Sequence, residues 1–181
     1  MGRNKLLLKI DGKTVLDRLL LVLNCVLDDI ILVTGYDPEP IKKVAEDYNL
    51  KIIHNPDFDK GMTTSFKTGL RATNADAVFL VLGDQLGLEM SLLRRMISAM
   101  EDSNALIVIP KYEDKKGHPT LFRRPVFDEL LSLGDSDTIR DVVIRHEAEQ
   151  ITVEGSKWTT LDFDTQKDFM IAKKFWKKSM I

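Results

Sequence analysis

The sequence predicts an α/β protein with three layers, in which a Rossmann-like, mostly parallel sheet carries helices on both faces. Apolar, β-branched runs alternate along the chain with segments whose apolar side chains recur at helical spacing. Each run is apolar almost throughout, which is typical of strands buried on both faces of a parallel sheet. No linker, repeat or low-complexity tract divides the 181 residues, so we expect residues 1–181 to form a single domain.

The first elements show the alternation clearly. Residues 29–34 form a β-branched run that Gly35 ends, and residues 40–49 place their apolar side chains on one helical face. A short strand is expected over residues 51–54, because an Asn-Pro pair stops it directly. A helix over residues 65–72 completes this half.

The second half begins with the same pattern and then loosens. Residues 77–82 form an apolar strand that a Gly-Asp pair ends, residues 89–100 have helical spacing, and residues 105–109 form another apolar strand. Pro110 ends this regular alternation. The later elements are expected as helices over residues 125–133, 138–146 and 165–178 and a strand over residues 150–153.

Charge and cysteine content restrict the classes of function. Lys and Arg number 26 against 28 Asp and Glu, and the resulting charge of −2 gives no reason to expect a nucleic acid or an anionic membrane as partner. Cys25 is the only cysteine, which excludes an internal disulfide and a cysteine-based zinc site within one chain. The longest apolar stretch, residues 15–27, contains charged residues and is too short to span a bilayer. We therefore expect a cytoplasmic protein. We also expect a monomer or weak dimer, because no apolar stripe lacks an obvious role in the core.

Two carboxylates are candidates for a metal site. Ligands of open parallel sheets bind beyond the carboxyl ends of the strands, and Asp84 follows the strand at residues 77–82. A carboxylate there suits Mg²⁺, which binds few protein carboxylates together with water and phosphate oxygens. A plain turn-forming Asp is the alternative. Asp162 lies in an extended segment before the last expected helix, and the two carboxylates would hold one Mg²⁺ if the fold brings them together.

Two loops carry further polar groups. Thr64 and Ser65 lie at the start of an expected helix, where hydroxyl and N–H groups bind an anion or a base edge; the alternative is an ordinary N-cap. His118 lies in a Gly-His-Pro loop, where it either contacts an acidic substrate or is solvated. The sequence contains no Walker-type phosphate loop, dinucleotide-binding glycine motif, zinc-protease motif or serine-hydrolase elbow.

Taken in order, several short motifs resemble the MobA-like nucleotidyltransferase family. Residues 1–8, Met-Gly-Arg-Asn-Lys-Leu-Leu-Leu, are similar to the second half of the family signature L-A-x-G-x-S-x-R-M-G-x-x-K-L-L. Gly-Asp-Gln and Gly-His-Pro are most similar to the molybdenum cofactor cytidylyltransferase branch. The other motifs follow in the family's order over nearly the whole chain: Asn-Pro at 55–56, Gly-Met-Thr-Thr-Ser at 61–65, Gly-Asp-Gln at 83–85, Gly-His-Pro at 117–119 and Leu-Asp-Phe-Asp-Thr at 161–165.

The resemblance implies the nucleotide-diphospho-sugar transferase type of fold and a Mg²⁺-dependent reaction. On this resemblance, CMP would pass from CTP to the molybdopterin cofactor with release of pyrophosphate, and a transient contact with a molybdoenzyme or an insertion chaperone is expected. The protein would supply positioning and charge, and no covalent group. The implied roles are Lys5 at the triphosphate, Asp84 and Asp162 at Mg²⁺, Thr64, Ser65 and Gln85 at the nucleotide, and His118 at the acceptor, with Lys5 and Asp84 as the catalytic residues.

One departure from the family concerns the start of the chain. The signature's first half and the strand before it have no counterpart here, and that strand lies centrally in the family's sheet. A gap there would leave two neighbouring strands with unpaired backbone groups. We expect one of three outcomes: upstream residues in the natural protein, pairing by residues 5–10 in place of the strand, or an altered sheet.

Two other interpretations of the function stay open. One is a guanylyltransferase, or another NTP transferase that acts on a phosphorylated small molecule. The other is a truncated, non-catalytic protein that binds the cofactor.

Overall fold

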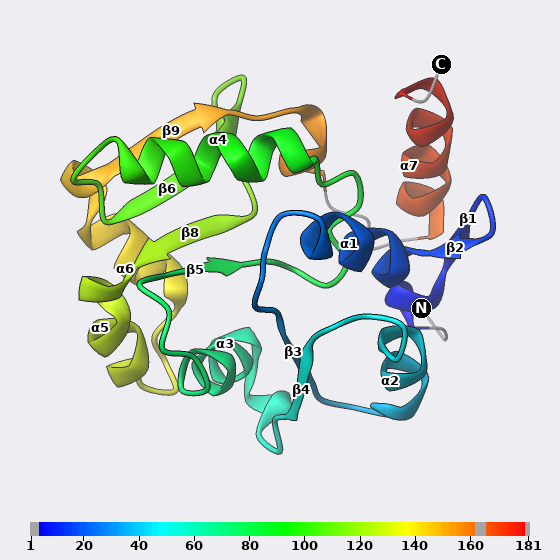
Figure 1. Ribbon diagram of the computed structural model, residues 1–181, viewed down its shortest axis with the longest axis horizontal. Helices are drawn as coiled ribbons and strands as arrows, with labels where there is room; N and C mark the ends of the chain where they lie inside the picture. Colours follow the sequence, from blue (N-terminus) through cyan, green and yellow to red (C-terminus); the bar gives the residue numbers. More distant parts are fainter. Residues whose placement is uncertain (1–3, 162–165, 180–181) are drawn as a thin grey trace.

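The computed structural model describes residues 4–161 and 166–179, which form layers of helix, sheet and helix (Figure 1). Within these residues no helix is both long and apolar enough to cross a membrane. The strands are β1 (Lys9–Ile10), β2 (Lys13–Thr14), β3 (Ile31–Thr34), β4 (Lys51–His54), β5 (Ala77–Leu80), β6 (Ile107–Tyr112), β7 (Lys115–Lys116), β8 (Thr120–Arg123) and β9 (Gln150–Glu154).

The helices occupy most of the segments between these strands. The α-helices are α1 (Val15–Asn24), α2 (Glu39–Ala45), α3 (Met62–Leu70), α4 (Met90–Glu101), α5 (Phe127–Ser132), α6 (Ile139–Arg145) and α7 (Gln166–Ser179). Short 3-10 turns are η1 (Lys5–Leu7), η2 (Phe58–Lys60), η3 (Arg124–Val126), η4 (Glu147–Glu149) and η5 (Lys157–Thr159).

Strand pairing confirms the α/β class and shows a mixed sheet. β3 pairs with β4 in parallel, and β6 pairs with β9 in parallel. β8 lies between β5 and β6 and is antiparallel to both. It returns from the short β6–β7 hairpin, and a connection that short produces antiparallel neighbours. The sheet is therefore less parallel than the apolar runs alone indicated.

Side chains on the two faces of the sheet pack into two separate hydrophobic cores. On one face, Val108 and Leu121 pack with leucines of α1 and with Leu92, Leu93 and Met96 of α4. On the other face, Leu80, Ile107 and Phe122 pack with α3, α5 and α6. This alternation of side chains along each strand is what makes the sheet the middle layer.

The start of the chain does not substitute for a central strand. Lys5–Leu7 form the turn η1, and β1 pairs with β2 in a small hairpin of its own. Within the described residues, β3–β4 therefore forms one sheet and β5-β8-β6-β7, with β9 on β6, forms another. Of the three expected outcomes, pairing by residues 5–10 is wrong and an altered sheet is what the structure shows.

Candidate active site

The carboxyl end of β5 carries the first part of the candidate site. The chain leaves β5 through residues 81–83 and reaches Asp84, whose Oδ2 lies 3.4 Å from Nζ of Lys5. Lys5 is the first residue of η1, and the side-chain oxygen of the N-cap residue Asn4 accepts a hydrogen bond from Leu6 N. The side chains of Lys5 and Asp84 are 31% and 36% exposed, so both remain accessible to a ligand.

Gln85 connects this loop to the loop of His118. Gln85 is 7% exposed, and its Nε2 donates a 2.6 Å hydrogen bond to the carbonyl oxygen of His118. The His118 N–H in turn donates to the carbonyl oxygen of Thr159 at 2.8 Å. Asp84, Gln85, His118 and Thr159 line one small pocket together with Leu161. The structure thus brings three of the predicted site residues and the segment before Asp162 to one place.

Gly117 explains how the loops approach so closely. A Cβ at this position would lie 2.1 Å from the carbonyl oxygen of Thr159, so any other residue would displace one loop. The buried Oε1 of Gln85 receives no hydrogen bond within the described part of the chain, and a ligand donor would satisfy it. Buried polar groups of Gln85 and of the His118 loop are therefore held in place next to the partly exposed Lys5–Asp84 pair.

Thr64 and Ser65 lie in the first turn of α3, but both hydroxyls have structural partners. Nδ2 of Asn55 donates to Thr64 Oγ1 at 2.9 Å and to Ser65 Oγ at 3.0 Å. Thr64 Oγ1 lies 2.9 Å from the carbonyl oxygens of Asp57 and Gly61. These bonds fix the loop before α3, so Thr64 is held in place by its own turn.

Asn55 is the residue whose importance the sequence reasoning missed. It is 2% exposed, it joins the end of β4 to α3, and its Oδ1 accepts from Asp57 N at 3.1 Å. The Asn-Pro pair was interpreted as a strand terminator and a family motif. A buried Asn before a hydroxyl-rich helix start is a signal for such a bridge, because a buried amide needs partners.

The predicted metal ligands lie partly outside the described residues. Asp84 presents a half-exposed carboxylate next to a cation, whereas Asp162 falls in the segment 162–165 that the structure does not describe. In the described ranges no group of three or more His, Cys, Asp or Glu side chains could hold a metal ion. One accessible carboxylate still fits Mg²⁺, because this ion completes its shell with water and phosphate oxygens.

Comparison with known proteins assigns the family. Residues 1–151 match the MobA-like NTP transferase domain family. The chain belongs to this family. The molybdenum cofactor cytidylyltransferase of Escherichia coli (strain K12) is 29% identical over 174 residues, which covers 96% of this chain and 88% of that protein. A MobA-like NTP transferase is a nucleotidyltransferase, as the resemblance implied.

Solved structures agree with this assignment. Rv0371c from Mycobacterium tuberculosis H37Rv has 26% identity and a TM-score of 0.80, covering 96% of this chain and 91% of that one. Its complex with manganese has 28% identity and a TM-score of 0.77, with 96% and 93% covered. A nucleotidyl transferase from Methanothermobacter thermautotroptrophicus (Mth528) shares the fold at 21% identity and a TM-score of 0.81, with 97% and 86% covered. The fold of this MobA-like chain is that of the nucleotide-diphospho-sugar transferases.

Proposed function

We propose that this chain is a cytidylyltransferase that transfers CMP from CTP to a molybdopterin-type acceptor and releases pyrophosphate. The observation that carries the proposal is the Lys5–Asp84 pair, half-exposed at the carboxyl edge of β5 beside the His118 loop. The choice of CTP and of the acceptor rests on the E. coli relative, whose name states that chemistry. The reaction would take place in the cytoplasm, followed by a transient contact with a molybdoenzyme or an insertion chaperone.

The transfer requires the protein to stabilise negative charge, and it requires no covalent intermediate with a protein side chain. An oxygen of the acceptor's phosphate forms a bond to the α-phosphorus of CTP, and the bond from that phosphorus to the bridging oxygen of the β-phosphate breaks. Pyrophosphate leaves with the electron pair. Lys5 offers a compact positive charge to the phosphates, where negative charge accumulates.

Lys5 and Asp84 would exchange partners when the nucleotide binds. Nζ of Lys5 lies 3.4 Å from Oδ2 of Asp84. When a triphosphate is present, Lys5 turns to its oxygens, and the carboxylate of Asp84 becomes free to hold Mg²⁺ together with Asp162. Mg²⁺ supplies neutralisation of phosphate charge when bound. The manganese complex of Rv0371c supports a divalent-ion requirement in this family.

The remaining predicted residues would bind or position the substrates. Ser65 would face the nucleotide across the start of α3, and Thr64 would keep that turn in shape through its bonds to Asp57 and Gly61. Gln85 would act mainly by positioning, because its amide nitrogen already holds the backbone of His118. His118 would then present its ring to the acceptor from a fixed loop.

Thermal unfolding with Mg²⁺ and each of CTP, GTP, ATP and UTP tests the proposal. We expect a CTP-selective rise in Tm of roughly 5 to 10 °C at about 100 times the Kd, because such binding adds about 2.7 kcal/mol. Asp84→Asn should abolish most of the shift and the Mg²⁺-dependent release of pyrophosphate from CTP and molybdopterin.

Asp76→Asn is the matched control. Asp76 lies just before the other end of β5, where its exposed carboxylate pairs with Arg124. This variant should keep the full CTP shift. A GTP-selective shift would replace the cytidylyltransferase proposal with a guanylyltransferase. Molybdopterin binding without pyrophosphate release in the unaltered protein would indicate a non-catalytic cofactor-binding protein.

A further inference from the structure

The loop that follows β5 is fixed just beyond its two predicted site residues. Leu86 is 2% exposed and packs in a hydrophobic cluster. Gly87 has a φ of +74°, and a Cβ at this position would lie 2.3 Å from Cδ2 of Trp158. The indole therefore lies directly against the backbone of Gly87, and it also lines the small pocket that contains Asp84 and Gln85. We call residues 83–88 the Asp84 loop.

The cluster that holds Leu86 also holds the turn of Lys5. Its buried members include Ile10, Val15, Leu86 and, from α7, Phe169 and Ala172. Leu8, which packs against these residues, donates its N–H to the carbonyl oxygen of Lys5 at 3.2 Å, and its own carbonyl oxygen accepts from Val15 N at 3.0 Å. One cluster thus supports both members of the Lys5–Asp84 pair, and we call it the C-terminal cluster.

Helix α7 covers this cluster. Figure 1 shows α7 beside the β1–β2 hairpin, and Trp176 of α7 meets Trp158 edge to face with 6.1 Å between the ring centroids. The guanidinium carbon of Arg18 lies 4.6 Å from the centroid of the Trp176 ring, and Arg18 Nε donates a 3.1 Å hydrogen bond to the carbonyl oxygen of Ile10. Aromatic pairs and cation–π contacts both prefer particular orientations. Trp176 is therefore held in place by Arg18 and supports the indole of Trp158.

Trp158 is also joined to the His118 loop. The next residue, Thr159, is 5% exposed, and its carbonyl oxygen accepts a 2.8 Å hydrogen bond from His118 N. The N–H of Gln85 donates to the carbonyl oxygen of Leu82 at 3.0 Å. A movement of Trp158 would therefore disturb both loops of the candidate site. The amides of Gln85 and His118, which we call the loop amides, report on that movement.

We propose that Trp158 is a positioning residue, through which α7 holds the Asp84 loop opposite Lys5. Trp158 contacts the loop and Trp176 contacts Trp158, so the helix acts on the site through the aromatic pair. The side chain of Asp84 is 36% exposed, so its alignment depends on how the loop behind it is held. Only the consequence for Mg²⁺ binding rests on the proposed function; the positioning of the loop does not.

Amide hydrogen exchange of the full chain tests the proposal. The N–H groups of Lys51 and Asn55 donate hydrogen bonds to residues 30 and 34, and they serve as reference strand amides. We expect Trp158→Leu and Trp176→Leu to speed the exchange of the loop amides at least about tenfold relative to the strand amides, because the loops open while the strands stay folded.

Two further variants separate positioning from a general loss of stability. Trp176→Phe keeps an aromatic ring beside Trp158, so its loop amides should stay within about threefold of those in the unaltered protein. Leu130→Ala is the matched control, because it truncates a fully buried side chain in a different core and should leave the ratio of loop to strand exchange unchanged. The proposal is overturned if the two leucine variants speed both classes of amide equally. It is also overturned if Trp176→Leu leaves the loop amides unchanged, since α7 would then not act through Trp158.

The Mg²⁺ concentration that half-saturates pyrophosphate release from CTP and molybdopterin is the second measurement. We expect it to rise about tenfold in Trp158→Leu and Trp176→Leu, because residues that hold a metal ligand in place affect metal affinity by about that much. This concentration does not depend on how much of the protein is folded. An unchanged value in variants whose loop amides exchange faster overturns the role toward Mg²⁺. An unaltered protein that releases no pyrophosphate would contradict the proposed function, whereas the amide exchange would still decide whether Trp158 positions the loop.

Discussion

His146 sits between two carboxylates of the surface cluster near α5 and α6. Its Nε2 lies 2.6 Å from Glu129 Oε2, and its Nδ1 lies 2.6 Å from Glu149 Oε2. The hydrogen bond to Glu129 raises the pKa of His146 above its ordinary value, and Glu149 adds to this effect. In return, His146 lowers the pKa of Glu129, with Arg145 contributing. Both shifts favour the charged forms of His146 and Glu129.

These pKa shifts predict a pH-dependent contribution to stability. A raised folded-state pKa of His146 stabilises the fold fully below its unfolded value of about 6.5, and this stabilisation is lost as pH rises through the folded value. The lowered pKa of Glu129 acts in the other direction, so its contribution is lost as pH falls through its own folded value. His146→Gln should thus cost up to about 1 kcal/mol near pH 5.5 and much less at pH 9, by urea unfolding. An equal cost of His146→Gln at both pH values would contradict the assignment.

Single residues of the site were predictable where a general rule applied to them. Asp84 follows from the rule that ligands bind beyond the carboxyl ends of strands, and the structure pairs it with Lys5. The partners of Gln85 and Thr64 were not predictable. Short polar motifs specify residue types, whereas hydrogen bonds to His118 or Asp57 depend on how distant loops pack.

At the scale of elements, α1 depends on its N-cap residue, Thr14. Thr14 Oγ1 accepts a 3.0 Å hydrogen bond from Asp17 N, which satisfies a donor that the helix itself leaves free. Thr14→Ala should lower the free energy of unfolding by about 1 kcal/mol, measured by chemical denaturation. Thr14→Ser keeps the acceptor and should recover most of this loss. If the two variants lose equal stability, the methyl group and not the cap is what matters at this position.

The elements that sequence periodicity predicted are those with a clear local pattern. The strand at 51–54 matches β4 as expected, and the helix at 138–146 corresponds to α6 (Ile139–Arg145). α1 and β8 were missed. The buried residues of α1 recur at helical spacing, but they lie in a nearly continuous apolar stretch, where the polar face of a helix is hard to recognise. β8 is four residues long and is stabilised by β5 and β6 on its two sides, so no local pattern identifies it.

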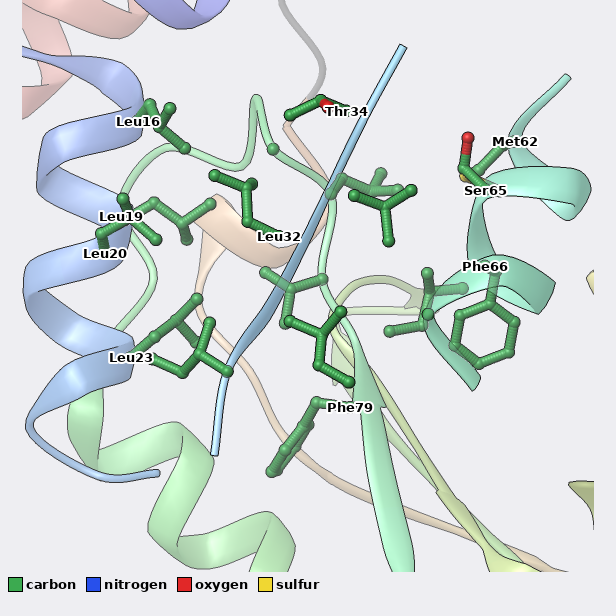
Figure 2. Close-up of a pocket in the computed structure, with 18 of the residues that line it drawn as sticks. Leu16, Leu19, Leu20, Leu23, Leu32, Thr34, Met62, Ser65, Phe66 and Phe79 are labelled. Atoms are coloured by element: carbon green, nitrogen blue, oxygen red, sulfur yellow. The ribbon is translucent and has the colours of Figure 1, made fainter. Parts of the chain in front are cut away.

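At the scale of the whole molecule, the division into two sheets was anticipated only as one of three outcomes. Periodicity identifies strands but not which strands pair. Whether residues 5–10 form a strand of the sheet depends on their contacts with residues distant in sequence. Leu6 and Leu7 pack in η1 against Leu16 and Leu20 of α1, which draws this segment out of the sheet plane. The cavity of about 730 Å³ between β3 and β5 is a consequence of that tertiary arrangement (Figure 2).

This cavity predicts that equal truncations in two parts of the core have unequal costs. Leu19 is 4% exposed and lines the cavity, whereas Leu130 of α5 is fully buried against the sheet that contains β5, β6 and β8. A side chain that borders an empty space already lacks contact atoms on one side, so its removal loses less packing energy. Leu130→Ala should cost about 4 to 5 kcal/mol and Leu19→Ala about 2 to 3 kcal/mol, by urea unfolding of both variants. Equal costs of the two substitutions would show that the cavity is closed in solution.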